Sequence, residues 1–188
     1  MPRVIRSFLA FEIDSEAVLK KLANVQALLL KTEASLKLVK PKNIHVTMRF
    51  LGNIALSIVE NIFEEMKKVQ FSSFDIKVQG VGVFPHLRHP RVVWAGITEG
   101  AEHIRNIYNQ LEPRLRMLGF APDPKGFSPH LTIARVKSGK NKAELADYVK
   151  ENLHLEFGIV RVECLKLKRS NLTPIGPVYS TLKEFCPE

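Results

Sequence analysis

The sequence predicts an α+β fold of two lobes related by a pseudo-twofold axis, each a mostly antiparallel sheet with helices packed outside it. Strand-like and helix-like segments alternate in the same order in both halves of the chain. Single residues of the first half also recur 85 positions later, namely Ala10 as Ala95, His45 as His130 and Thr47 as Thr132. We therefore expect one bilobal domain over residues 1–188, duplicated in tandem, with pseudo-repeats of roughly 1–88 and 89–188.

The first half contains five predicted elements: a strand at 6–13, a helix at 15–31, a strand at 43–52, a helix at 57–69 and a strand at 74–84. The first helix has apolar residues at helical spacing after Ser15, which suits an N-cap, and Ser57 is expected to open the second helix in the same way. The strand at 43–52 alternates apolar and polar residues until Gly52.

The second half repeats this order with a strand at 91–98, a helix at 101–119, a strand at 127–137, a helix at 142–153 and a strand at 157–169. Pro113 lies inside the first of these helices, where proline can kink the axis, and Gly119 suits its C-terminal end. An extended segment at 176–185 has no counterpart, and the Pro- and His-rich residues 82–93 are expected to link the halves.

Charge and cysteine content narrow the class of protein. Lys and Arg number 28 against 19 Asp and Glu, a net charge of +9, which favours a polyanionic partner such as RNA or else a simple solvated basic surface. No apolar run approaches the roughly 20 residues of a membrane-spanning helix. Cys164 and Cys186 form no CxxC motif, so they are expected to be reduced thiols of a soluble cytoplasmic protein, with Cys164 in the core.

The His-x-Thr sequences at His45 and His130 are the candidate catalytic motifs. Alternate residues of a strand share a face, so His45, Thr47 and Arg49 point one way, and His130 points with Thr132. One such pair alone is better explained as core packing, but two in the same register favour a joint site. Near pH 7 one imidazole can be neutral and the other protonated, which supplies a general base and a general acid.

The adjacent hydroxyls could hold an anionic tetrahedral centre, and the basic surface makes a phosphodiester the natural reacting group. A histidine pair could instead hold a metal, but zinc usually takes three or four protein ligands and the sequence offers no Cys or carboxylate at ligand spacing. We therefore expect neither a metal nor a cofactor. Walker, GxGxxG and GxSxG motifs are also absent from the sequence.

At these motifs the chain resembles the 2H phosphoesterase superfamily, and within it the RNA 2′,3′-cyclic phosphodiesterases, also called 2′-5′ RNA ligases. The resemblance rests on "HVTMRFLG", "FSPHLTIARV" and the late "LTPIGPVY", and it spans the chain. It implies metal-free hydrolysis of a terminal 2′,3′-cyclic phosphate to a 2′-phosphate, with His45 as general acid and His130 as general base. It also implies a positively charged active-site cleft between the two lobes, with both motifs on its floor, and contacts of Thr47, Thr132 and Arg135 with the phosphate.

Arg135 conflicts with strict alternation, which places it on the face opposite His130 unless a bulge or a strand end intervenes. Arg49 is on the correct face by alternation, so it remains a possible substrate-binding residue. Phe84 and Phe127 could stack on a base or be ordinary core aromatics, and Tyr179 is a candidate to pack over the cleft. Arg88, Arg91 and Lys125 are candidates for contacting the RNA backbone.

The expected partner is an RNA with a 2′,3′-cyclic phosphate end, tRNA fragments among the candidates, and the expected state is a monomer with no obligate protein partner. Two alternatives stay open at this point. The same cleft could favour the reverse reaction, joining RNA ends through a 2′-5′ linkage, or the chain could be a non-catalytic module that binds RNA ends. Acid–base catalysis predicts a bell-shaped pH–rate profile, whereas a binding module shows no turnover.

Overall fold

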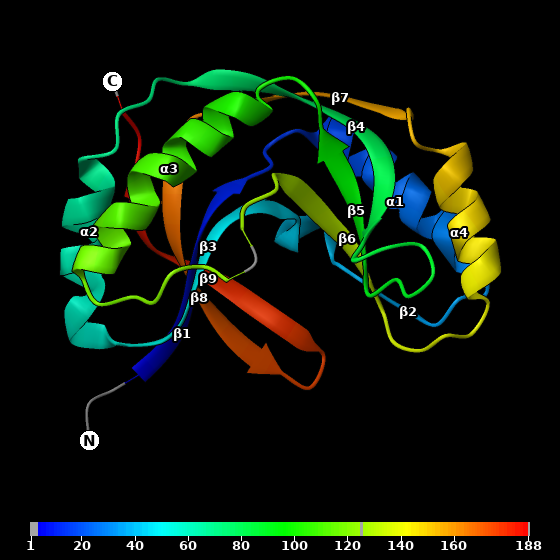
Figure 1. Ribbon diagram of the computed structural model, residues 1–188, viewed down its shortest axis with the longest axis horizontal. Helices are drawn as coiled ribbons and strands as arrows, with labels where there is room; N and C mark the ends of the chain where they lie inside the picture. Colours follow the sequence, from blue (N-terminus) through cyan, green and yellow to red (C-terminus); the bar gives the residue numbers. More distant parts are fainter. Residues whose placement is uncertain (1–3, 125, 188) are drawn as a thin grey trace.

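A computed structural model describes residues 4–124 and 126–187 as one antiparallel sheet with four α-helices packed on it (Figure 1). The strand order is β7-β4-β5-β6-β3-β1-β8-β9, and the short strand β2 pairs with β6 beside β3. Every strand pairing within the described ranges is antiparallel. The predicted α+β fold is confirmed.

The first half forms β1 (Val4–Glu12), α1 (Glu16–Lys31), β2 (Leu36–Leu38), the 3₁₀ helix η1 (Pro41–Asn43), β3 (His45–Ala55), the 3₁₀ helix η2 (Leu56–Ile58), α2 (Val59–Lys67) and β4 (Phe74–Phe84). Ser15 caps α1 as predicted, because its Oγ accepts a hydrogen bond from the Val18 amide at 3.4 Å. The prediction that Ser57 caps the second helix is wrong. Ser57 lies inside η2, and Ile58 precedes α2 without a side-chain cap.

The second half forms β5 (Val92–Ile97), α3 (Ala101–Met117), β6 (His130–Val136), α4 (Lys142–Glu151), β7 (Glu156–Val162), β8 (Leu165–Thr173) and β9 (Gly176–Phe185). Pro113 is accommodated within α3. The single strand predicted at 157–169 is in fact β7 and β8, which break at residues 163–164 and lie far apart in the strand order. Neither glycine nor proline marks this break, so the continuous apolar pattern concealed it.

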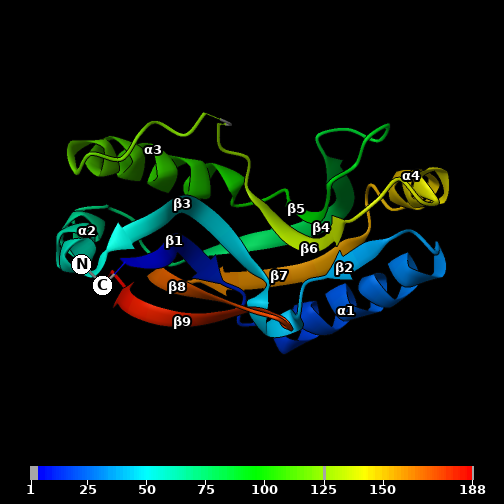
Figure 2. The same ribbon diagram turned by 90° about the horizontal axis from the view of Figure 1, so that it is seen from below.

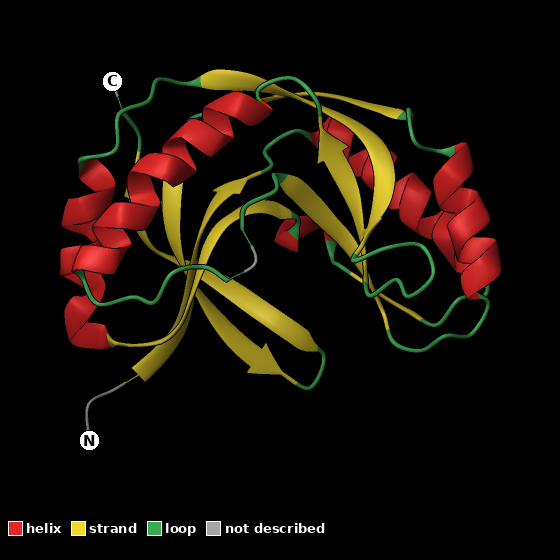
Figure 3. Ribbon diagram, in the orientation of Figure 1, coloured by secondary structure: helices red, strands yellow, loops and turns green. Residues whose placement is uncertain are grey.

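The helices flank the sheet in two groups, α2 with α3 at one end of the molecule and α1 with α4 at the other (Figures 1, 2 and 3). Helix α1 packs on β6 and β7 from the second half of the chain, whereas α3 packs on α2 from the first half. Each half of the sheet is therefore completed by elements from both halves of the sequence. Among the described residues, no helix is long and apolar enough to cross a membrane.

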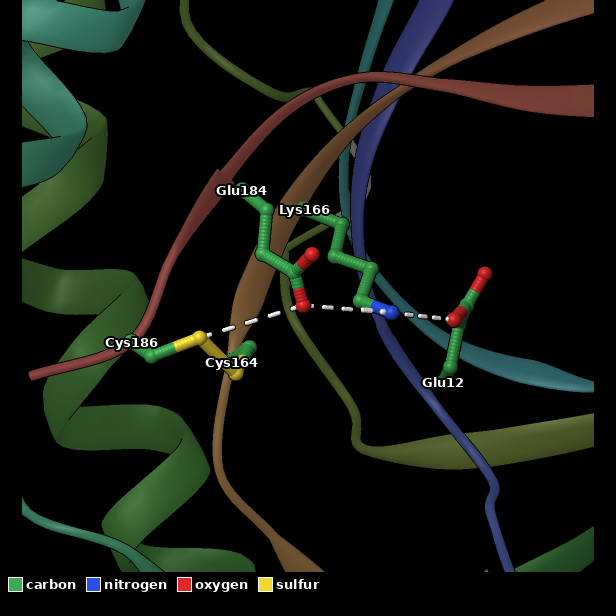
Figure 4. Close-up of a disulfide and its surroundings, with 5 residues drawn as sticks. All are labelled: Glu12, Cys164, Lys166, Glu184 and Cys186. Carbon is green, nitrogen blue, oxygen red and sulfur yellow. Dashed lines mark hydrogen bonds and ion pairs between the residues drawn. A yellow bond between two sulfur atoms is a disulfide. The ribbon is translucent and has the colours of Figure 1, made fainter.

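The cysteines form a disulfide, so the prediction of two reduced thiols is wrong (Figure 4). Strands β8 and β9 pair up to Leu165 and Phe185, and the next residues outward are Cys164 and Cys186, with Cα atoms 4.2 Å apart. Cys164 is half-buried and Cys186 is exposed, so neither is a core residue. Glu184 Oε1 lies 3.8 Å from the Cys186 sulfur, which in a disulfide has no proton to donate.

Candidate active site

The two His-x-Thr motifs meet at the middle of the sheet. Val46 of β3 pairs with Leu131 of β6, and these two residues occupy the same position in the two motifs. An antiparallel pair of equivalent residues lies on a local twofold axis, as the duplicated sequence predicts. If this register continues by one residue in each direction, His45 lies opposite Thr132 and Thr47 lies opposite His130. We call the side of the sheet that carries these four residues the motif face.

Both imidazoles are held in the same way by the backbone. Nδ1 of His45 lies 2.7 Å from the Asn43 carbonyl oxygen, and Nδ1 of His130 lies 2.7 Å from the Ser128 carbonyl oxygen. A carbonyl only accepts, so each Nδ1 carries the proton and donates it. Each Nε2 is then the nitrogen available to exchange a proton with a substrate.

Burial dominates the protonation of both rings. It lowers the pKa of His45 to about 4, and the Lys168 and His130 charges act in the same direction while the Asn43 carbonyl and Glu12 oppose them. Burial also lowers the pKa of His130. The expectation of one neutral and one protonated ring near pH 7 therefore does not describe the free protein, where the neutral form of both is favoured.

The environment of His45 is more aromatic than that of His130. Phe8 of β1 stacks on the His45 ring at 4.9 Å, and Tyr179 of β9 packs edge-on against it at 5.5 Å. Phe8 and Tyr179 also contact each other at 4.9 Å. Phe84 of β4 packs edge-on against His130 at 4.9 Å. Tyr179 thus lies over the first motif, as the sequence suggested.

A bulge in β6 resolves the conflict over Arg135. Thr132 pairs with Trp94 and Ala134 with Val93, so Ile133 is an extra residue that has no partner in β5. The extra residue reverses the alternation, and Ile133 and Ala134 are both buried while Arg135 is exposed. Arg135 therefore returns to the face that carries His130.

Two electrostatic effects place the Arg135 charge near both motifs. Burial is the main cause of the lowered pKa of His130, and the positive charge of Arg135 lowers it further. Burial raises the pKa of Tyr179, and the charges of Arg135 and Arg6 counteract that rise. Lys37 lies opposite Arg135 in the β2–β6 pairing and adds a second cation beside it.

The matching bulge in β3 has the opposite consequence for Arg49. Leu9 pairs with Arg49 and Ala10 with Thr47, so Met48 is the extra residue, at the position equivalent to Ile133. Arg49 then leaves the motif face, and its Nε donates to Glu112 of α3 at 2.8 Å while its Nη2 donates to the Ala121 carbonyl. The prediction that Arg49 shares a face with His45 is wrong for this reason.

The other residues that the sequence predicted to bind RNA do not all lie beside the motifs. Phe84 contacts His130 and, at 5.3 Å, Trp94, whereas Phe127 stacks at 4.3 Å on Tyr108 of α3. Arg88 and Arg91 are exposed in the segment that joins β4 to β5. Lys125 lies outside the described residues.

An ion cluster lies beside His45 on the motif face. Glu12, the β1 partner of His45, accepts hydrogen bonds from Lys166 at 2.5 Å and from Lys168 (Figure 4 shows Glu12 and Lys166). Lys168 is 8% exposed and also donates to Thr181 Oγ1 at 3.0 Å. Burial works to raise the pKa of Glu12, but the two lysines outweigh it and the pKa falls. Lys166 also pairs with Glu184 at 3.4 Å, so two ammonium groups are balanced by two carboxylates in this cluster (Figure 4).

Sequence reasoning missed three residues on this face, which are Phe8, Phe50 and Trp94. Phe50 is 55% exposed and occupies the position equivalent to Arg135, a match that the 85-residue offset could have revealed. Trp94 pairs with Thr132, and its buried Nε1 has no hydrogen-bond partner in the described chain. A Cβ atom at Gly82 would overlap the Trp94 ring, so this glycine makes room for it.

Comparison with known proteins identifies the family. Residues 13–94 and again 96–179 match the family described as LigT like Phosphoesterase. The chain belongs to this family. Curated LigT-like relatives named RNA 2′,3′-cyclic phosphodiesterase include one from Archaeoglobus fulgidus, 37% identical over 187 residues that cover 96% of this chain and 99% of the relative. Another, from Methanothermobacter thermautotrophicus, is 35% identical over 184 residues, 96% of this chain and 98% of the relative.

Solved structures show the same LigT-like fold. TT0787 of Thermus thermophilus superposes with a TM-score of 0.80 at 27% identity, over 97% of each chain. Escherichia coli LigT in complex with 3′-AMP superposes with a TM-score of 0.81 at 20% identity, over 98% of each chain, a likeness that concerns the fold alone.

Proposed function

We propose that this protein hydrolyses the 2′,3′-cyclic phosphate at the end of an RNA to a 2′-phosphate, using both His-x-Thr motifs and no metal. The observation that carries the proposal is the Val46–Leu131 pairing, which brings two equivalent histidines to one face across a local twofold axis. The name RNA 2′,3′-cyclic phosphodiesterase, carried by relatives that align over nearly the whole chain, supports the same substrate.

In the proposed reaction, water attacks phosphorus as Nε2 of His130 takes its proton, and the P–O3′ bond breaks as Nε2 of His45 protonates O3′. In-line displacement requires a base and an acid on opposite sides of the phosphorus, which a twofold pair of imidazoles supplies. Thr47, Thr132 and Arg135 hold the non-bridging oxygens. Support for these roles comes from the bulge at Ile133 and from the Arg135 charge acting on His130.

The general acid must be protonated, although burial lowers the pKa of His45. An anionic phosphate beside the ring favours the imidazolium, so substrate binding raises the pKa of His45. Burial still opposes this rise in the complex, so His45 remains a stronger acid there than an exposed imidazole beside the same phosphate would be. A stronger acid transfers its proton more readily to the departing O3′.

Metal-free chemistry is supported by the types of residue present. Within the described residues, the one group of three or more His, Cys, Asp or Glu with metal-ligand spacing is Cys164, Glu184 and Cys186, and its two thiols are joined in the disulfide. Among the described residues, His45 and His130 thus form no such group with a third ligand, and the carboxylate of Glu12 beside His45 is bound by Lys166 and Lys168. Two imidazoles alone are fewer than the three protein ligands that catalytic zinc usually has.

Product identity tests the proposal. An RNA oligonucleotide ending in a 2′,3′-cyclic phosphate is incubated with the protein in EDTA, and the terminal phosphate is located by its resistance to an enzyme that removes 3′-phosphates only. We expect a 2′-phosphate from the wild type and from His86→Ala, which changes an exposed histidine of the β4–β5 segment. Binding without turnover would leave an RNA-end-binding module, and loss of turnover in EDTA would show a metal enzyme.

A further inference from the structure

The β8–β9 hairpin carries an apolar tip that no other described part of the protein covers. Leu172 is 68% exposed and Ile175, in the turn, is 75% exposed. Figure 1 shows the hairpin projecting from the body of the molecule with its turn clear of the helices. Exposed aliphatic side chains gathered on one projection of a small protein indicate a binding surface.

The tip continues the motif face. Tyr179, which packs on His45, pairs with Ser170, and Leu172 pairs with Pro177 two residues further along both strands. Leu172 therefore points to the same side as Tyr179, whereas Val178 points to the opposite side. An extended ligand that has one end at His45 can reach Leu172 along this side of the hairpin.

The hairpin is held in position relative to His45. Asn43, which is 6% exposed, donates its side-chain amide to the Pro177 carbonyl at 2.9 Å, and its own carbonyl accepts from His45. The Cys164–Cys186 disulfide joins the two strands at the other end. A surface fixed at both ends loses little conformational freedom when it binds a ligand.

Positive charge beside the hairpin suits a nucleic acid. Within the hairpin, Lys166, Lys168 and Lys183 are already paired with carboxylates. The charge that faces a ligand here is instead that of Arg6 and Arg135, which act on Tyr179. An apolar tip that leads into this positively charged site resembles the combination of packing surface and positive groove that binds single strands. A second copy of this basic chain seated on the tip would meet like charge and cover the motif face.

Building on the proposed function, we propose that the tip of the β8–β9 hairpin binds the nucleotides that precede the terminal cyclic phosphate. Leu172 and Ile175 pack against the bases and riboses of this single-stranded segment. The protein therefore acts on oligoribonucleotide ends in preference to cyclic mononucleotides, because a mononucleotide fills the catalytic end and leaves the tip uncovered.

The test compares 2′,3′-cyclic AMP with a tetranucleotide that ends in the same cyclic nucleotide. The tip variant is Leu172→Ser with Ile175→Ser, and the matched control is Val178→Ser, which removes a 44% exposed side chain from the other side of the same hairpin. We expect the tip variant to lose about tenfold in kcat/KM for the tetranucleotide, as the loss of aliphatic burial implies. The tip variant should keep the wild-type kcat/KM for 2′,3′-cyclic AMP. Val178→Ser should keep the wild-type kcat/KM for both substrates.

Several results would overturn the inference. Among them are a tip variant unchanged on both substrates or equally weakened on both, and an equal loss in Val178→Ser. A dimer that the tip variant abolishes, measured by light scattering, would instead assign the tip to a second copy. If the wild type hydrolyses neither substrate, the proposed function fails separately. Anisotropy with a labelled 2′-phosphate tetranucleotide then still tests the hairpin, and equal binding by wild type and tip variant rejects it.

Discussion

The side chain of Gln26 in α1 donates a hydrogen bond at 2.8 Å to the carbonyl of Ile133, the bulged residue of β6 107 positions away in the chain. The same amide donates to the Val39 carbonyl at 2.7 Å, and the Val39 amide donates to Ile133 at 2.9 Å. Gln26 is 4% exposed, so these bonds are made where an unpaired carbonyl would be costly. The bulge that returns Arg135 to the motif face is therefore fixed from the opposite side of the sheet.

Replacing Gln26 by leucine should weaken both the fold and the site. The half-buried Val39 carbonyl loses the Gln26 donor, and the buried Ile133 carbonyl keeps only the Val39 amide, which should lower the free energy of unfolding by about 2 kcal/mol in urea titrations. Turnover should fall further than stability explains, because Arg135 is less well held. Gln70→Leu, at an exposed position, is the control. A Gln26→Leu protein with wild-type kcat/KM would show that the bulge does not depend on this side chain.

The two arginines near the motifs should behave differently. Arg135→Ala should lower kcat by about 10²–10³, the usual effect of removing one donor to a transition-state oxyanion. Arg49→Ala should leave kcat nearly unchanged but reduce stability by about 1–2 kcal/mol, because Glu112 loses its partner in a largely buried pair. Steady-state kinetics and urea unfolding measure the two effects. If Arg49→Ala lost the activity and Arg135→Ala kept it, the bulges would not have exchanged the faces of the two arginines.

The pH dependence follows from the lowered pKa of both histidines. The proposed reaction requires a protonated His45, and this form is lost in the free protein as the pH rises above a pKa of about 4. The profile of kcat/KM, which reports the free protein, should therefore peak on the acid side of pH 6.5. The profile of kcat should lie at higher pH, because bound phosphate raises the pKa of His45. A kcat/KM optimum above pH 7.5 would contradict this description.

The disulfide should contribute to stability. It closes a loop with a sequence separation of 22, for which chain entropy predicts about 3 kcal/mol. Cys164→Ser should lower the free energy of unfolding by about that amount in urea, and dithiothreitol should lower it equally in the wild type. Dithiothreitol should have no effect on Cys164→Ser. Equal stability of the wild type with and without the reductant would show that the bond does not stabilise the fold.

Residue spacing was enough to predict the frame of the site. The offset shared by His45 and His130 predicts a duplication, and strand alternation predicts that each histidine lies beside its threonine. The second inference depends on the two-residue alternation of side chains along a strand, which is regular between each histidine and its threonine. Residue spacing also predicted Ser15 as a cap but could not separate β7 from β8, because no turn residue marks the break at 163–164.

What could not be predicted depends on contacts between distant residues. Alternation assumes a regular strand, so the bulges at Met48 and Ile133 reversed the expected faces of Arg49 and Arg135. The bond that fixes the second bulge comes from a glutamine that looks like any polar residue of an amphipathic helix. The disulfide likewise depends on the β8–β9 register, which no local signal at Cys164 or Cys186 reveals.

The most direct test of the central claim, that two motifs form one active site, is a kinetic cycle of His45→Ala, His130→Ala and the double variant. Turnover of an RNA ending in a 2′,3′-cyclic phosphate is measured in EDTA for all four proteins. A joint acid–base pair predicts that each single variant loses about as much activity as the double variant, because residues that act as a unit are strongly non-additive. If the two losses multiply, or if either single variant keeps wild-type turnover, the histidines do not share one reaction.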